Sequence, residues 1–189
     1  MKNDVLFRYK EQFDKNGYFV FKNFLTKDFV SKLITEINNA SGTVKYFDNL
    51  NNLRRIEKLY DKGTNLINLN EKISILLKKI FDKEFLIFKD KFNSKPPGGE
   101  GFFAHYDGIF EFINSKDEKK RGWYEYGDFF ISALIAIDKC DKENGALELA
   151  KSHNGDFAQL YKNTKKDGTP ALSDEVESKT KFKVIDLEV

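Results

Sequence analysis

Apolar residues change their spacing near residue 83, and this change restricts the fold more than any other feature of the chain. Before it, they recur at helical intervals, as in the stripe formed by Val30, Leu33, Ile34 and Ile37. After it, they alternate or form short continuous runs, which is typical of strands. Helices followed by short strands favour an α+β fold that is mainly β, with N-terminal helices packed on a β sandwich or jelly roll.

The same patterns predict individual elements. Three helices are expected, over residues 4–16, over residues 27–40 with Thr26 as N-cap, and after Asn70 as N-cap. The expected strands share alternating or continuous apolar runs and lie at 18–21, 84–92, 101–108, 129–137, 146–150 and 181–189. Residues 43–69 are rich in Asn and charge and predict no clear element.

Composition sets the class of the chain. Its 189 residues suit one domain over residues 1–189, with a helical part over about 1–82 and a β core over about 84–189. Lys plus Arg number 32 against 30 Asp plus Glu, so the formal charge is +2, which argues against a dedicated nucleic-acid binder. With 40% apolar and 15% aromatic residues, the chain is not expected to be disordered.

Cysteine content and the N-terminal residues bear on location. Cys140 is the single cysteine and cannot form an intramolecular disulfide, so a reducing compartment is expected. The first residues show neither the apolar run nor the cleavage site of a signal peptide, and no stretch approaches a membrane span. These features predict a cytoplasmic protein without a membrane partner.

One of the two histidines stands two residues before an aspartate, in His105-Tyr106-Asp107. Residues i and i+2 of a strand point to the same side, so an imidazole nitrogen and a carboxylate oxygen converge there. One carboxylate and two imidazoles form the facial site of non-haem Fe(II) oxygenases. Taken alone, the pair fits both a metal site and a solvated strand end.

Three stretches of sequence give the pair a wider context. Residues 86–108 contain the run FKDK, a Pro-Pro-Gly-Gly loop and then the His-x-Asp pair. Residues 12–25 read QFDKNGYFVFKNFL, and residues 131–153 combine an apolar run, an Asn-Gly turn and a Ser-His pair. In this order the three stretches resemble the phytanoyl-CoA dioxygenase family.

That resemblance implies a double-stranded β-helix, a fold of the jelly-roll and cupin type, with Fe(II), 2-oxoglutarate as cosubstrate and O₂. His105 and Asp107 take the family's first two metal-ligand positions, so they are the expected catalytic and metal-binding residues. Related halogenases replace the carboxylate with a small residue, so Asp107 favours hydroxylation, with a small molecule as the expected substrate. Substrate specificity in this family comes from loops such as residues 109–128.

Four further residues are candidates for binding the cosubstrate. Lys89 and Lys91 share a face of the preceding strand and suit a 2-oxoglutarate carboxylate, although a solvated lysine-rich face is the simpler interpretation. Trp123 stands where related enzymes place a Trp beside the cosubstrate, but it fits an ordinary core aromatic equally well. Arg55 lies where the family often has a basic residue, and a surface salt bridge is its alternative.

The family's remaining site residues do not have clear counterparts. His153 aligns with the Ser-His loop, which does not bind metal in the family. The family's distal His, and the Arg that grips 2-oxoglutarate, follow a strand that begins like residues 182–189. We therefore predict an incomplete chain with little activity of its own. The alternative is a non-catalytic jelly-roll binding protein with a degenerate metal site.

Overall fold

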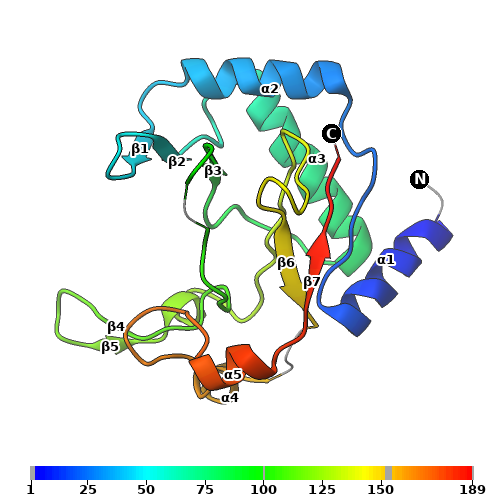
Figure 1. The fold of residues 1–189 in the computed structure, drawn as a ribbon. Helices are drawn as coiled ribbons and strands as arrows, with labels where there is room; N and C mark the ends of the chain where they lie inside the picture. The colour runs from blue at the N-terminus through cyan, green and yellow to red at the C-terminus, as the bar shows by residue number, and fades with distance from the viewer. Residues whose placement is uncertain (1–2, 100, 152–154, 189) are drawn as a thin grey trace. The chain divides into compact units, whose positions relative to one another are not determined.

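The computed structural model describes residues 3–99, 101–151 and 155–188. The chain divides into two compact units, drawn in Figure 1 with its helices and short strands. The first unit comprises Met1–Glu100, Leu134–Leu147 and Val184–Val189, and the second comprises Gly101–Ala133 and Glu148–Lys183. Helices and small antiparallel sheets together make an α+β chain, whereas the jelly roll stays a prediction.

Two helices of the first unit form where their sequences predict them. These are α1, Asn3–Asn16, and α2, Lys27–Asn39. Thr26 caps α2, because its side-chain oxygen accepts a hydrogen bond from the Phe29 backbone N–H at 3.3 Å. The apolar stripe of α2 is confirmed at Val30, Leu33 and Ile37, which are buried.

The third helix, α3, extends from Thr64 to Phe81, so the prediction that it starts at Asn70 was wrong. Gly63 occupies the N-cap and offers no side chain. Glu36 of α2 replaces the local cap, because its carboxylate accepts hydrogen bonds from the backbone N–H groups of Asn65 and Leu66, both at 3.0 Å. A cap that comes from another helix leaves no signal beside the helix that it caps.

Glu36 and Gly63 are packed so closely that a side chain at residue 63 would collide with the carboxylate. A Cβ built at Gly63 would lie 2.3 Å from Glu36 Oε2. Burial raises the pKa of Glu36, but the hydrogen bonds from Asn65 and Leu66 outweigh it and leave the pKa below its ordinary value. The negative charge therefore stays at the positive end of the α3 dipole.

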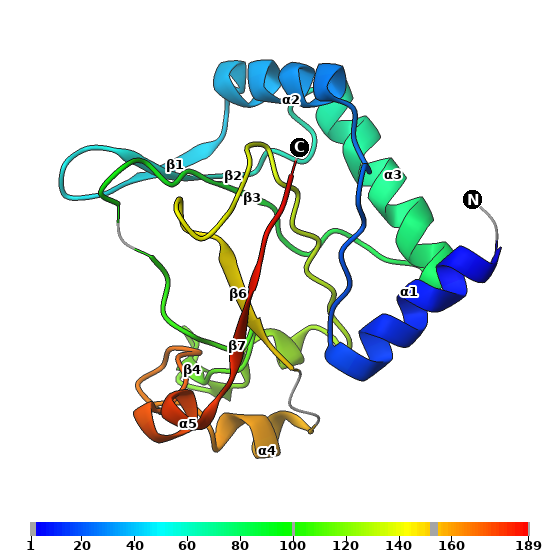
Figure 2. The same cartoon turned by 45° about the vertical axis from the view of Figure 1, so that its right-hand side comes forward.

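The first unit also contains a three-stranded antiparallel sheet with the strand order β1-β2-β3 (Figure 2). Its strands are β1, Val44–Phe47, β2, Leu53–Glu57, and β3, Lys91–Asn93. The hairpin β1–β2 lies in the Asn-rich segment for which no element was expected. The prediction of a long strand over residues 84–92 was wrong except at its C-terminal end. No strand of the described residues pairs with the backbone of 84–90.

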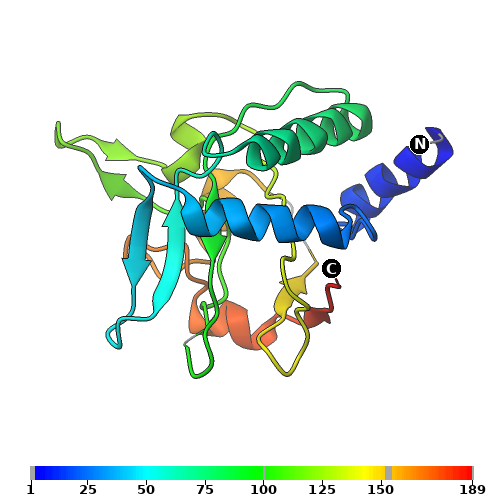
Figure 3. The ribbon, with the colours of Figure 1, turned by 90° about the horizontal axis from the view of Figure 1, so that it is seen from above.

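The core of the first unit joins α2 and α3 to the sheet. Its buried cluster consists of Leu33, Ile37, Ile56, Leu59 and Leu66. Ile56 of β2 is only 2% exposed, and its register partner on β3 is Phe92, which packs against the same cluster. Figure 3, seen from above, shows α2 and α3 alongside each other in this unit. One face of the sheet is thus committed to the core.

The second unit contains less regular structure. Its elements are β4, Phe112–Ile113, β5, Lys119–Lys120, the 3-10 helix η1, Gly122–Glu125, α4, Phe157–Tyr161, and α5, Asp174–Lys179. β4 and β5 form an antiparallel hairpin. Ile109 is 2% exposed, and Phe157, Ala171 and Leu172 are also buried.

The remaining sheet consists of two strands that each carry residues of both units. Strands were expected at 146–150 and 181–189, and β6, Leu147–Ala150, and β7, Phe182–Ile185, form within these segments and pair with each other. The described residues form no strand at 18–21, 101–108 or 129–137, where strands were expected. An apolar run becomes a strand only when another backbone satisfies its hydrogen bonds, and these three runs lack a paired ladder.

Candidate active site

His105 and Asp107 lie together in the second unit. The distance between His105 Nε2 and Asp107 Oδ1 is 3.4 Å, and the two side chains are 34% and 49% exposed. The i, i+2 spacing thus brings the two side chains together, although only a bridge between His105 and Ala171 forms in place of a full strand. The pair is accessible to a metal ion or small molecule from solvent.

Backbone hydrogen bonds hold this segment in an extended form. The Tyr106 N–H donates to the Pro170 carbonyl at 3.1 Å, and the Leu172 N–H donates to the Ala104 carbonyl at 2.9 Å. Residues 104–106 therefore run antiparallel to residues 170–172 around the His105–Ala171 bridge. Asn163 adds a side-chain contact, because its Nδ2 donates to the Tyr106 hydroxyl at 3.0 Å.

The histidine ring has a defined orientation. His105 Nδ1 lies 2.8 Å from the Phe103 carbonyl oxygen, and a carbonyl only accepts hydrogen bonds, so Nδ1 carries the hydrogen. In the neutral ring, Nε2 then presents its lone pair toward Asp107. Two electron-pair donors 3.4 Å apart repel each other unless a proton or a cation lies between them.

This geometry fits a metal ion. Nitrogen and carboxylate oxygen ligands lie at about 2.0–2.2 Å from a first-row divalent ion, so two of them can be as much as ~4.2 Å apart. The separation of 3.4 Å between Nε2 and Oδ1 is within that limit. A hydrogen bond from Nδ1 to a backbone carbonyl is also the usual outer support of a metal-ligating histidine.

The other oxygen of Asp107 is held by a residue that the sequence analysis missed. Ser132 Oγ donates a hydrogen bond of 2.6 Å to Asp107 Oδ2. Ser132 is the one polar residue within the apolar run 129–137, which is the signal that could have identified it. The carboxylate is therefore oriented, with Oδ1 toward His105 and Oδ2 toward Ser132.

Trp123 packs under the turn that follows Asp107. Gly108 has a φ of +77°, and a Cβ there would lie 2.7 Å from the Trp123 ring. The backbone N–H of Trp123 donates to the Gly108 carbonyl at 3.2 Å. The ring centroids of Trp123 and Phe130 are 5.4 Å apart. Trp123 thus supports the backbone beside the metal pair, while its expected role toward a cosubstrate stays a prediction.

The three basic candidates lie in the first unit, on the sheet face opposite Ile56. Arg55 Nη1 and Lys89 Nζ are 3.3 and 3.7 Å from Glu57 Oε1, and Lys91 is the register partner of Glu57. Tyr46 completes the group, since its hydroxyl donates to Glu57 Oε2 at 3.4 Å. The structure thus shows the ion pair that was the alternative for Arg55, and a role in cosubstrate binding stays a prediction.

A third metal ligand is not identified. Among residues 3–99, 101–151 and 155–188, no group of three or more His, Cys, Asp or Glu side chains is arranged to hold a metal ion. His153, the second histidine, lies outside the described residues. The structure therefore offers two candidate protein ligands, one imidazole and one carboxylate.

A larger cavity, of about 640 Å³, is formed by the second unit. Charged side chains of both signs and aromatic rings line it: Glu111, Arg121, Tyr124, Asp128, Asp156, Phe157, Ala158, Tyr161 and Lys162. A hydrogen bond from Lys119 lowers the pKa of Glu111, whereas burial and then the Glu111 contact raise the pKa of Tyr161. Much of the lining comes from residues 109–128, the expected specificity loop.

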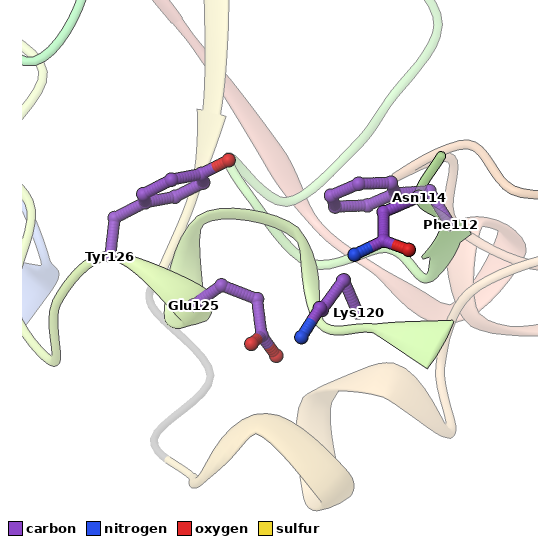
Figure 4. A pocket seen from close by; sticks show the side chains of 5 residues that line it. All are labelled: Phe112, Asn114, Lys120, Glu125 and Tyr126. Carbon is purple, nitrogen blue, oxygen red and sulfur yellow. The ribbon is translucent and has the colours of Figure 1, made fainter. Parts of the chain in front are cut away.

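A smaller cavity of about 260 Å³ lies beside the β4–β5 hairpin. It is lined by Phe112, Asn114, Lys120, Glu125 and Tyr126, and Figure 4 shows Lys120 and Glu125 extending toward each other. Glu118, 3.0 Å from Lys120 Nζ, is the main cause that raises the pKa of Lys120, and Glu125 adds to it. Both ends of the loop 109–128 thus contribute to cavities.

Comparison with known proteins finds similarity to a curated dioxygenase. The chain is 29% identical over 157 aligned residues to 2-aminoethylphosphonate dioxygenase of uncultured bacterium HF130_AEPn_1. The alignment covers 75% of this chain, and the chain spans about 55% of the length of that relative. No family model and no solved structure matches the chain.

No helix in the described part of the chain has both the length and the apolar character to cross a bilayer. The two observations that bear on function are the closely spaced His105 and Asp107 and the similarity to a curated dioxygenase.

Proposed function

We propose that this chain belongs to an Fe(II)- and 2-oxoglutarate-dependent dioxygenase that hydroxylates a small molecule. The observation that carries the proposal is the arrangement of His105 and Asp107. The tautomer fixed by Phe103 points the Nε2 lone pair at Asp107 Oδ1, 3.4 Å away, which is a geometry that requires a proton or a cation. Similarity to a curated dioxygenase favours the cation.

The protein would contribute one neutral nitrogen and one anionic oxygen to the ion. This is part of the two-histidine, one-carboxylate set of non-haem iron oxygenases, which keeps coordination positions open for other ligands. Iron supplies the activation of O₂ when it is bound. His105 and Asp107 would hold and orient the ion, and Ser132 would hold the carboxylate.

The cosubstrate role is assigned to the sheet face around Glu57. Arg55 and Lys89 form ion pairs with Glu57 there, Lys91 is its register partner, and 2-oxoglutarate is a dicarboxylate that such cations recognise. Replacing Lys91 or Lys89 with Met is expected to raise the concentration of 2-oxoglutarate needed for half-saturation. Calorimetric titration of the Fe(II)-loaded chain measures this. Lys45→Met is the matched control. Lys45 is the register partner of Ile56, so it lies on the same sheet face as Ile56 and away from Glu57.

The substrate is proposed to be a small molecule with charges of both signs. The relative is named for 2-aminoethylphosphonate, which carries an amine and a phosphonate. The larger cavity offers matching groups, with Arg121 and Lys162 as cations and Asp128 as an anion. 2-Aminoethylphosphonate is therefore the first compound to assay.

The metal pair is tested by Asp107→Ala and His105→Ala. Fe(II) binding, titrated without oxygen, is expected to be lost, because the ion loses one of the two candidate protein ligands. Circular dichroism is expected to stay at the wild-type signal, since both side chains are exposed by a third or more. Fe(II) binding that persists in both variants would contradict the proposed function.

A further inference from the structure

The hydroxyl of Ser132 forms the closest described contact to the candidate metal pair. It donates 2.6 Å to Asp107 Oδ2, the oxygen that does not face His105. A hydroxyl donating to a carboxylate is a charge-assisted bond, shorter and stronger than a bond between neutral groups. Nothing else in the sequence marks Ser132, apart from its polarity within the run 129–137.

The position of this contact has a mechanical consequence. A carboxylate can rotate about its last bond and exchange its two oxygens, and it can also bind an ion through both. A donor fixed on Oδ2 opposes both movements and leaves Oδ1 directed at the space beside His105 Nε2. Because the Asp107 side chain is 49% exposed, packing contributes little to that orientation.

The backbone on either side of the carboxylate is already constrained. Backbone hydrogen bonds join residues 104–106 to residues 170–172, and Gly108 packs against the Trp123 ring. The remaining freedom of Asp107 is therefore in its side chain, which is where Ser132 acts.

We infer that Ser132 is a positioning residue that presents Asp107 Oδ1 to the metal as a single-oxygen ligand. This inference rests on the proposed function and deepens it. Outer hydrogen bonds to metal ligands typically change metal affinity 10–100-fold, so loss of the Ser132 hydroxyl is expected to weaken Fe(II) binding by about that factor.

The test uses Fe(II) alone, titrated into the full chain without oxygen. Trp123 is the only tryptophan and packs against the residue after Asp107, so quenching of its fluorescence reports occupancy. Ser132→Ala is expected to raise the dissociation constant about 10–100-fold. Ser132→Thr keeps the hydroxyl and is expected to stay near wild type. Ser115→Ala, an exposed serine in the β4–β5 turn, controls for serine loss in the same unit.

A second pair of variants separates affinity from folding. Thr and Val have nearly the same shape and differ in the hydroxyl, so Ser132→Thr and Ser132→Val should bind Fe(II) with different affinities but melt at similar temperatures. Equal Fe(II) affinities for wild type, Ser132→Ala and this pair would overturn the inference while leaving the proposed function intact. Absence of Fe(II) binding by the wild-type chain would overturn both.

Discussion

The two units of this chain are held together in different ways. In the first unit, α2, α3 and the sheet share one buried apolar cluster, with Leu33 completely buried and Ile56 nearly so. The second unit has short elements, and single hydrogen bonds, a glycine turn and one tryptophan fix its key residues. Stability in the first unit is therefore distributed over many contacts, whereas the candidate site in the second depends on a few.

The strongest way to test this contrast is to remove a core side chain from the first unit. Leu33→Ala is expected to lower the free energy of unfolding by about 2–5 kcal/mol, because a fully buried leucine leaves a cavity. Chemical denaturation measures the change. Ile34→Ala, on the neighbouring residue that is 37% exposed, is the control and should cost clearly less. Equal losses would mean that the cluster does not dominate the unit.

A smaller effect is expected from the turn in the second unit. Gly108→Ala forces a left-handed residue to carry a Cβ 2.7 Å from the Trp123 ring, and strain of this kind costs about 1–3 kcal/mol. Fe(II) affinity is also expected to fall, because Asp107 precedes the turn. Thermal unfolding and fluorescence titration measure the two effects.

Gly98 provides the control for that substitution. Its φ is +73°, close to that of Gly108, but nothing lies within 4 Å of the Cβ that it would carry. Gly98→Ala is therefore expected to lower the free energy of unfolding through its backbone conformation alone, without a collision of its Cβ. The Fe(II) affinity should not change. If the two variants behave alike, packing on Trp123 does not support the site.

The smallest effect concerns the cap between α2 and α3. Glu36→Gln removes a charge from the start of α3 and weakens at least one of three hydrogen bonds to this side chain, at a cost of about 1 kcal/mol at neutral pH. The pKa of Glu36 is lowered on folding, so its contribution is present above its ordinary value of 4.5 and is lost as pH falls through the folded-state pKa. Denaturation of both proteins at pH 7 and pH 3 measures this, and a difference that grows in acid would contradict it.

The sequence predicted the parts of the fold whose signals are local. The stripe of α2 and its Thr26 cap lie within one segment and were confirmed. The start of α3 depends on Glu36, and β2 depends on partners on two other strands, so neither has a complete signal in its own segment. The apolar run 129–137 predicted a strand, yet strand formation requires a partner that the run itself does not specify.

The candidate site likewise has residues that local sequence signals predict and residues that depend on distant parts of the chain. His105 and Asp107 could be predicted because two residues of spacing bring them together. Ser132 is contributed from twenty-five residues away, and sequence spacing alone does not reveal that contact. Arg55 was predicted on position, but the structure shows that Glu57 organises it together with Lys89.

The bridge between His105 and Ala171 also matters for how the chain is made. The ribosome adds about 5–20 residues per second, so residues 170–172 follow the histidine and aspartate by several seconds. During that interval the nascent segment around His105 has no backbone partner from residues 170–172 to extend it. If the pair holds the proposed metal, its loading would therefore come late in biosynthesis, set by the order of translation as well as by affinity.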